Sequence, residues 1–197
     1  MSHFTKPRAL SNAVRRLEED DDEKGGFPIV EMVRKPYKQY EQIYTARHIH
    51  FYLSEQIGAP SEYTDMIFQI MSASEADTVF IHLNTSGGQM DTGIQIINAI
   101  QNTAANVITV LESTAYSMGS LIFLAGDEMV VNDNCMMMFH NFNGGLVGKG
   151  NELTLELEAT VKWYSTLARN LYVPFLSEEE LSRISRGEDM WMQSDEI

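Results

Sequence analysis

Residue types that together perform nucleophilic catalysis occur in the second half of this 197-residue chain. Ser117 stands between an apolar β-branched run and an apolar run of helical character, with Ala115 two positions before it and Gly119 two positions after it. This spacing approximates a nucleophile elbow, in which small residues relieve crowding at a sharp turn from strand to helix. Free N–H groups at the start of the helix would favour a developing negative charge. The alternative is that Ser117 only caps the helix, as serines often do.

A nucleophilic serine also needs a base and an acid that orients the base. His140 lies near the end of a predicted strand, just before a Gly-Gly pair, whereas His48, His50 and His82 fall within predicted strands and His3 lies near the N-terminus. The end of a strand is the more typical position for a site residue. The candidate acids are Asp189, Asp127, Asp133 and Asp91, and chemistry alone leaves them open.

A second junction, after the predicted strand 78–84, carries Gly87 and Gly88. Paired glycines let the backbone take positive φ and approach a ligand without a Cβ in the way. The simpler interpretation is a tight turn. A phosphate-binding loop is not supported, because the glycine spacing and the Lys-Ser/Thr ending of such loops are absent.

The elements that must position these residues alternate along the chain. The patterns predict strands at 48–53, 78–84, 106–112, 128–132 and 135–142, and helices at 63–76, 91–103, 117–126, 152–173 and 177–187. This order predicts an α/β fold with a mainly parallel sheet covered on both faces, and ligands bind beyond the carboxyl ends of such strands. Residues 1–40 are polar and carry an acidic run, which predicts a flexible tail that could serve as a gate or docking arm.

Composition limits the classes of partner. The net charge of −14 argues against nucleic acid, because phosphate binding needs a basic surface. The single cysteine, Cys135, cannot form an internal disulfide, which suits a reducing compartment. No stretch is apolar enough for a membrane span, and the first residues lack the apolar core of a signal peptide. We therefore expect a cytoplasmic protein with no membrane partner.

Four segments, taken in order, resemble the ClpP family, the serine peptidases that form the proteolytic chamber of Clp machines. They are HLNTSGG (82–88), TAYSMGSLIFLAG (114–126), MMMFHNFNGGLVGKGNEL (136–153) and GEDMWMQSDE (187–196). They are similar to the family's glycine turn, nucleophile segment, histidine segment and aspartate segment. The resemblance extends from about residue 47 to residue 196.

The resemblance implies a role for each matching position. Ser117 would be the nucleophile, His140 the general base and Asp189 the residue that orients it. The remaining assignments are Gly88 and Met118 as backbone donors of the oxyanion hole, and Gly144 and Gly145 as substrate-binding residues.

The family's architecture implies a ClpP/crotonase-like fold of repeated βα units over residues 41–197, with helix 152–173 as a protruding handle. Family members assemble as two stacked seven-membered rings, and an ATP-driven AAA+ unfoldase feeds polypeptide through an axial pore. We therefore expect a homo-oligomer with no cofactor of its own and ATP used only by the partner. Residues 1–40 would lie near the pore. The chain ends at Ile197, before the family's closing segment, which indicates a short divergent member or a missing piece.

Departures from the family pattern leave two alternatives open. Tyr116 adds bulk beside the nucleophile and is expected to narrow the cleft. His82, Asn102 and Glu112 stand where the family has an apolar pocket for the unfoldase, so docking of the usual partner is in doubt. The first alternative is a non-catalytic ring subunit with a structural or regulatory role. The second is an acyl-CoA enzyme of the crotonase fold, which would leave the Ser-His-Asp set unexplained.

Overall fold

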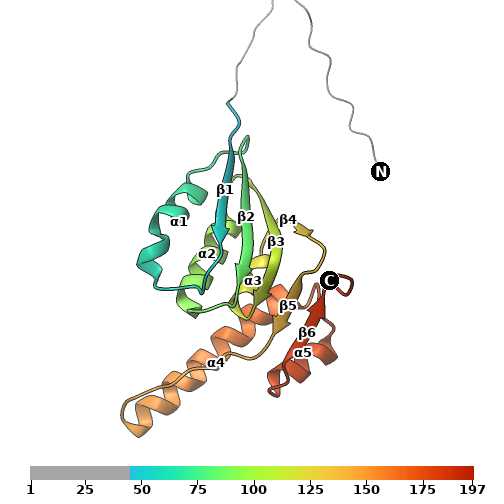
Figure 1. Cartoon of the computed structure of the whole chain (residues 1–197). Coiled ribbons are helices and arrows are strands. Elements are labelled where there is room, and N and C mark those ends of the chain that lie inside the picture. The colour runs from blue at the N-terminus through green and yellow to red at the C-terminus, as the bar shows by residue number, and fades with distance from the viewer. Residues whose placement is uncertain (1–44) are drawn as a thin grey trace, which may run out of the picture. The chain divides into compact units, whose positions relative to one another are not determined.

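The computed structural model describes residues 45–197, which fall within one compact unit (Figure 1). The predicted tail and axial gate over residues 1–40 lie outside the described residues. The elements in chain order are β1 (His48–Leu53), the 3-10 helix η1 (Pro60–Tyr63), α1 (Thr64–Met71), β2 (Thr78–Thr85), α2 (Met90–Asn102), β3 (Asn106–Tyr116), α3 (Met118–Phe123), β4 (Glu128–Val131), β5 (Met136–Phe139), α4 (Gly150–Tyr172), α5 (Glu178–Ser185) and β6 (Met190–Gln193).

The strands form one mixed sheet in the order β1-β2-β3-β5-β6. β1, β2, β3 and β5 are parallel, and β6 pairs antiparallel with β5. β3 is long enough to pair with two strands in succession. Its residues 108–111 pair with β4, and its residues 114–116 pair with β5. The carboxyl ends of β2, β3 and β5 therefore meet at one edge of the sheet.

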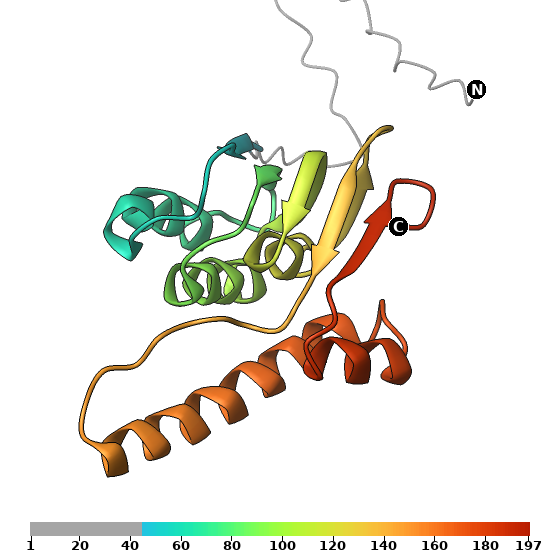
Figure 2. The ribbon, with the colours of Figure 1, turned by 60° about the horizontal axis from the view of Figure 1, so that its bottom comes forward.

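Helices α1, α2 and α3 lie on one face of the sheet, and no described helix covers the other face of β1, β2 and β3 (Figures 1 and 2). The prediction of a sheet covered on both faces was wrong. The strand order β1-β2-β3 runs in one direction without reversal. Because parallel crossovers are right-handed, successive helices then fall on the same side. The uncovered face carries exposed polar side chains, such as His50 and Glu112.

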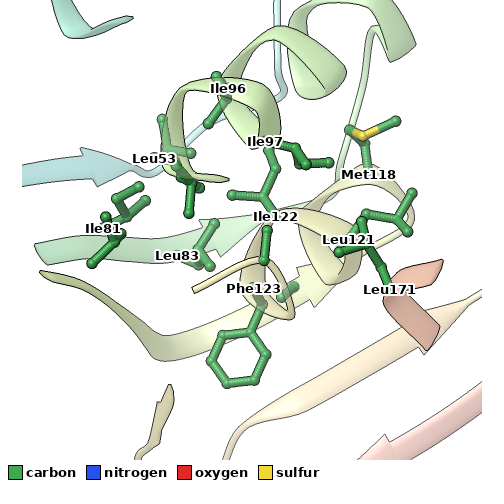
Figure 3. Close-up of a cluster of buried hydrophobic side chains, with 14 of the residues drawn as sticks. Leu53, Ile81, Leu83, Ile96, Ile97, Met118, Leu121, Ile122, Phe123 and Leu171 are labelled. Carbon is green, nitrogen blue, oxygen red and sulfur yellow. The ribbon is translucent and has the colours of Figure 1, made fainter. Parts of the chain in front are cut away.

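The core lies between the sheet and these helices (Figure 3). Ile81 and Leu83 of β2 are fully buried, while His82 between them faces the other side. Ile97 of α2 and Ile122 of α3 complete the same cluster. Burying one such side chain contributes about 1.5–3 kcal/mol, so the cluster holds α3 firmly against the end of the sheet.

Helix α4 is the predicted handle. It has 23 residues and a length of about 35 Å, and it projects away from the sheet, with the segment after β5 running back beside it (Figure 2). Its buried residues are all in the second half: Tyr164, Ala168, Leu171 and Tyr172. The first half carries exposed apolar side chains, including Leu155 and Leu157. Only the second half is therefore fixed by the core.

Several element bounds differ from the predictions. The helix expected to reach residue 76 ends at Met71, because the Asp77 carboxylate accepts a hydrogen bond from Ser74 N–H at 2.8 Å and closes a turn there. β3 extends four residues beyond its predicted end at 112 and reaches Tyr116. The predicted strand 135–142 is shortened to Met136–Phe139, and the strand β6 was not predicted.

Candidate active site

Ser117 and His140 meet at the carboxyl ends of two neighbouring strands. Ser117 directly follows β3 and His140 directly follows β5. The parallel register places Tyr116 beside Met138, and Ser117 N–H donates to the Met138 carbonyl at 2.9 Å. The Ser117 Oγ then lies 2.6 Å from His140 Nε2. The structure thus brings the predicted nucleophile and the predicted base into direct hydrogen-bond contact.

The backbone of Ser117 has the conformation of a sharp elbow, with φ 55° and ψ −119°. A positive φ is uncommon for a residue with a Cβ and stores about 1–3 kcal/mol of strain. Although Ser117 directly precedes α3, its side chain makes no capping hydrogen bond. The simple capping interpretation is therefore wrong for this residue, since its hydroxyl meets the imidazole instead.

Neighbouring glycines leave room for this elbow. A Cβ added to Gly87, whose φ is +85°, would lie 2.8 Å from the Cβ of Ser117. A Cβ added to Gly119 would lie 2.7 Å from Thr85 Cγ2. Both distances are too short for real contacts, so larger residues at either position would displace the elbow.

Two backbone N–H groups are available beside Ser117. Met118 is the first residue of α3, so its N–H has no acceptor within the helix. Gly88 is in a bridge with Ile57 in which Ile57 N–H donates to Gly87 O and Gln89 N–H donates to Ile57 O. This pattern leaves the Gly88 N–H outside the bridge. A Cβ on Gly88 would lie 2.1 Å from the Ile57 carbonyl oxygen, so only glycine fits.

Ser117, His140 and the two residues with free N–H groups, Gly88 and Met118, border one cleft of about 430 Å³. The residues that line it are Gln56, Ser86, Gly88, Gln89, Met90, Ser117, Met118, Met138, His140, Phe142, Asn143 and Tyr164. Gly144 and Gly145, the predicted substrate-binding pair, follow Asn143 directly but are exposed and do not line the cleft. A Cβ added to either would meet nothing within 4 Å.

Asp189 lies close to His140 in the register of the sheet but is not bonded to it. β5 and β6 pair Phe139 with Met190, so the next antiparallel step places His140 opposite Asp189. Asp189 is exposed, and no hydrogen bond joins it to His140 within residues 45–197. The orienting role of Asp189 stays a prediction.

Tyr116 does not narrow the cleft, contrary to expectation. Its hydroxyl donates to Met136 Sδ at 3.6 Å, and its ring packs edge-on against Trp191 with centroids 5.2 Å apart. It is absent from the residues that line the cleft. The residue just before Ser117 faces away from the nucleophile because side chains alternate along β3.

Sequence reasoning missed several residues of the cleft, and among them Tyr164 of α4 contacts the backbone of the proposed base. Its hydroxyl donates to the His140 carbonyl at 3.1 Å, and its ring packs against Phe142 with centroids 5.1 Å apart. Burial raises the pKa of Tyr164 to about 12, so the hydroxyl keeps its proton at ordinary pH. No signal in the sequence distinguishes this tyrosine from an ordinary apolar position of a long helix.

Comparison with known proteins decides the family. The Clp protease family profile, described as Clp protease, matches residues 31–197, which is most of the chain. The chain belongs to the Clp protease family. It is 30% identical over 126 residues to a protein of Ostreococcus tauri named ATP-dependent Clp protease proteolytic subunit, and the match covers 62% of each chain. The family resemblance and the ClpP-like α/β fold expected from the sequence are thereby confirmed.

Other Clp protease relatives carry the same name. The chain is 28% identical over 113 residues to a protein of Chlorella vulgaris, covering 56% of this chain and 55% of that one. It is 28% identical over 104 residues to a protein of Chlamydomonas reinhardtii, covering 52% of this chain and 20% of that one. The matched region thus spans less than two thirds of these relatives. Within residues 45–197, no helix is long and apolar enough to cross a membrane.

Proposed function

We propose that this Clp protease family member is a serine endopeptidase, with Ser117 as nucleophile and His140 as general base. One observation carries the proposal: the Ser117 hydroxyl, held on a strained elbow, lies 2.6 Å from His140 Nε2 in an open cleft. A side chain kept in a costly backbone conformation and directed at a base is typical of a catalytic position.

Each step of peptide cleavage has a group in the cleft. His140 Nε2 takes the proton as Ser117 Oγ attacks the scissile carbonyl, and the N–H groups of Gly88 and Met118 donate to the resulting oxyanion. The imidazolium then gives its proton to the leaving amine as the C–N bond breaks. A water, deprotonated by the same imidazole, cleaves the acyl-enzyme and regenerates the serine hydroxyl. Asp189 would orient and stabilise the imidazolium from the opposite strand.

The substrate would be an extended, unfolded polypeptide. The segment after His140 runs without helix or strand structure to residue 149, so its backbone is available for pairing along a peptide. Gly144 and Gly145 have no side chain that would block such pairing. Recognition through main-chain hydrogen bonds gives little sequence preference, which suits degradation of many polypeptides.

The assembly and partners follow the family. We propose stacked seven-membered rings of this chain in the cytoplasm, fed by a Clp-type AAA+ ATPase, so that ATP is used by the partner and the peptidase needs no cofactor. The exposed apolar side chains of α4 support oligomer formation, because they would be buried between subunits: Leu155, Leu157, Val161 and Trp163. Docking of the usual unfoldase stays in doubt because His82 is paired with Glu112 on the uncovered face of the sheet.

A fluorophosphonate probe tests the activity directly. The assembled wild-type protein should be labelled at Ser117, located by peptide mass spectrometry, and should cleave a fluorogenic peptide. Ser117→Ala should lose both, whereas Ser113→Ala, which alters an exposed serine four residues earlier, should keep both. Labelling of another residue, or cleavage by Ser117→Ala, would refute the assignment of the nucleophile.

A second candidate function is a non-catalytic ring subunit. The observation that favours it is the exposed Asp189, which makes no hydrogen bond to His140 in the described part of the chain. In that case, the wild-type protein would form rings but would be neither labelled nor active. Ring formation is measured by electron microscopy of the same sample used for labelling.

A further inference from the structure

Two tyrosine hydroxyls of α4 make hydrogen bonds around the proposed catalytic residues, one directly to the backbone and one through a serine side chain. Tyr164 Oη lies 3.1 Å from the His140 carbonyl oxygen. Tyr172 Oη lies 2.9 Å from Ser120 Oγ, which lies 2.7 Å from the Ser117 carbonyl oxygen. We propose that Tyr172 and Ser120 are positioning residues that direct the Met118 N–H into the cleft, while Tyr164 fixes the backbone of His140. This inference rests on the proposed function and adds the groups that control its oxyanion donor.

The direction of the hydrogen bonds follows from the number of protons. Ser120 has one hydroxyl proton, and a carbonyl can only accept, so that proton is donated to the Ser117 carbonyl. The hydroxyl of Tyr172 must then donate to Ser120 Oγ. The chain therefore runs from Tyr172 to Ser120 to the Ser117 carbonyl without ambiguity.

The Ser117 carbonyl and the Met118 N–H belong to the same peptide group. In a planar trans peptide the C=O and the N–H point in opposite directions. A carbonyl held by Ser120 N–H at 3.0 Å and by Ser120 Oγ at 2.7 Å on one side thus fixes the N–H on the other side. That other side is the cleft, which Met118 lines. The two bonds from Ser120 to this carbonyl, one from its backbone N–H and one from its hydroxyl, therefore set the orientation of the oxyanion donor.

Water does not compete for these bonds. Ser120 and Tyr172 are fully buried. Burial raises the pKa of Tyr172 well above its usual range, so its hydroxyl stays protonated and remains a donor. A buried hydrogen bond is also costly to leave unmade, so this series of hydrogen bonds resists rearrangement.

Aromatic packing and hydroxyl hydrogen bonds together hold the two tyrosine rings. Tyr172 packs edge-on against Phe139 with centroids 5.3 Å apart, and Tyr164 packs against Phe142. A cavity of about 310 Å³ between α4 and α5 borders both tyrosines. Since both donors lie on the second half of α4, a displacement of this half would move the Ser117 peptide and the His140 backbone together.

The test measures kcat and KM separately in the assembled full chain. Tyr172→Phe and Ser120→Ala each remove one hydroxyl and keep the rest of the side chain's carbon frame. Each should lower kcat for a fluorogenic peptide by about ten- to hundredfold, with KM within about twofold, because the Met118 N–H acts mainly on the transition state. The double variant should show no larger loss of kcat than the less active of the two single variants, because both substitutions interrupt the same series of hydrogen bonds.

Active-site titration with a fluorophosphonate gives kcat per reactive site and removes the effect of misfolded protein. Ser72→Ala is the matched control, because it removes a serine hydroxyl that donates to a helix carbonyl, Phe68 O, at 2.6 Å on α1. It should leave kcat unchanged. An unchanged kcat per labelled site in Tyr172→Phe and Ser120→Ala, or a loss equal to the loss of labelled sites, would overturn the positioning role while the proposed function stands. A wild-type protein that neither labels nor cleaves would overturn the proposed function and this inference with it.

Discussion

Two histidines of this chain make short hydrogen bonds in different parts of the same sheet, but only one of them is bonded to a candidate nucleophile. His140 contacts the Ser117 hydroxyl in the cleft. His82, on the uncovered face, contacts Glu112 Oε1 through Nδ1 at 2.6 Å and His50 Nδ1 through Nε2 at 3.0 Å. Of the two, His82 has the partner set that more closely resembles a carboxylate–imidazole relay, yet it cannot perform acyl transfer.

The backbone explains the difference. His50 and His82 come from the middles of β1 and β2, where the N–H groups are used in regular strand pairing, and Glu112 lies inside β3. The ring of His50 stacks on Phe80 with centroids 4.4 Å apart, and the ring of His82 stacks on Tyr52 with centroids 4.3 Å apart. Ser117 lies instead where a strand ends, with positive φ and with the free N–H of Met118 beside it. The comparison teaches that strand ends, and not the number of imidazole partners, supply the chemistry.

The largest expected effect compares the two histidines directly. His140→Ala should lower kcat/KM for a fluorogenic peptide by at least about 10⁴-fold, because the base is removed. His82→Ala should change it by less than about twofold, since His82 does not border the cleft. Equal losses in the two variants would show that the uncovered face takes part in catalysis. Thermal unfolding of both variants controls for misfolding.

A smaller effect compares the two carboxylates. Asp189→Asn should lower kcat by about 10²- to 10⁴-fold, because the imidazolium loses its orienting charge. Glu112→Gln, a matched change next to His82, should leave kcat unchanged. Because Asp189 is exposed in the single chain, its loss should be measured in the assembled protein. An effect of less than about threefold would assign the orienting role to another group.

The fold and the candidate site differ in how far the sequence could predict them. Strands such as β1 and β2 were predicted to within one residue, because β-branched and apolar runs bounded by turn residues define them locally. β6 was missed because it forms a strand by antiparallel pairing with β5, a segment distant in the sequence. The covered face was mispredicted because it depends on the order of strands, which periodicity does not report.

At the site, the sequence supplied Ser117, His140 and the glycine turn from local motifs. The roles of Tyr164 and Tyr172 could not be predicted, because a tyrosine at a helical apolar position reads as core. The orientation of Tyr116 was also mispredicted, since side-chain alternation places the residue before the nucleophile on the far side. Motifs thus indicate which groups react, whereas tertiary packing decides which groups hold them in place.

Lowering the pH should loosen β1 before it affects the core around the cleft. Arg47 and Ser74 donate hydrogen bonds to Asp77 and hold the pKa of this carboxyl well below its usual range. A lowered folded pKa stabilises the protein above the unfolded value of about 3.9, and this contribution is lost as pH falls towards the folded value. Arg47 precedes β1 and Asp77 precedes β2, so the loss should loosen β1, which carries His50.

The measurement is the urea midpoint of wild type and Asp77→Asn between pH 7 and pH 3. The wild-type midpoint should be higher at pH 7 and should fall more steeply below about pH 4. Hydrogen exchange at pH 7 should be faster in β1 of Asp77→Asn than in wild type, with β3 unchanged. Parallel pH curves for the two proteins would show that Asp77 contributes nothing that depends on its charge.

The smallest effect concerns backbone strain, which the comparison places at Ser117 and not in the middle of β3. Ser117→Ala keeps a Cβ at φ 55°, so the strain remains. Ser117→Gly relieves the strain, but glycine loses more conformational entropy on folding, which costs about 0.5–1 kcal/mol. The glycine variant should therefore be more stable than the alanine variant by about 1 kcal/mol in urea unfolding. At Ile108, in the regularly paired part of β3, the order should reverse, because glycine weakens a regular strand. If glycine is also the less stable variant at Ser117, the elbow is not strained, and its conformation cannot be counted as evidence for a catalytic serine.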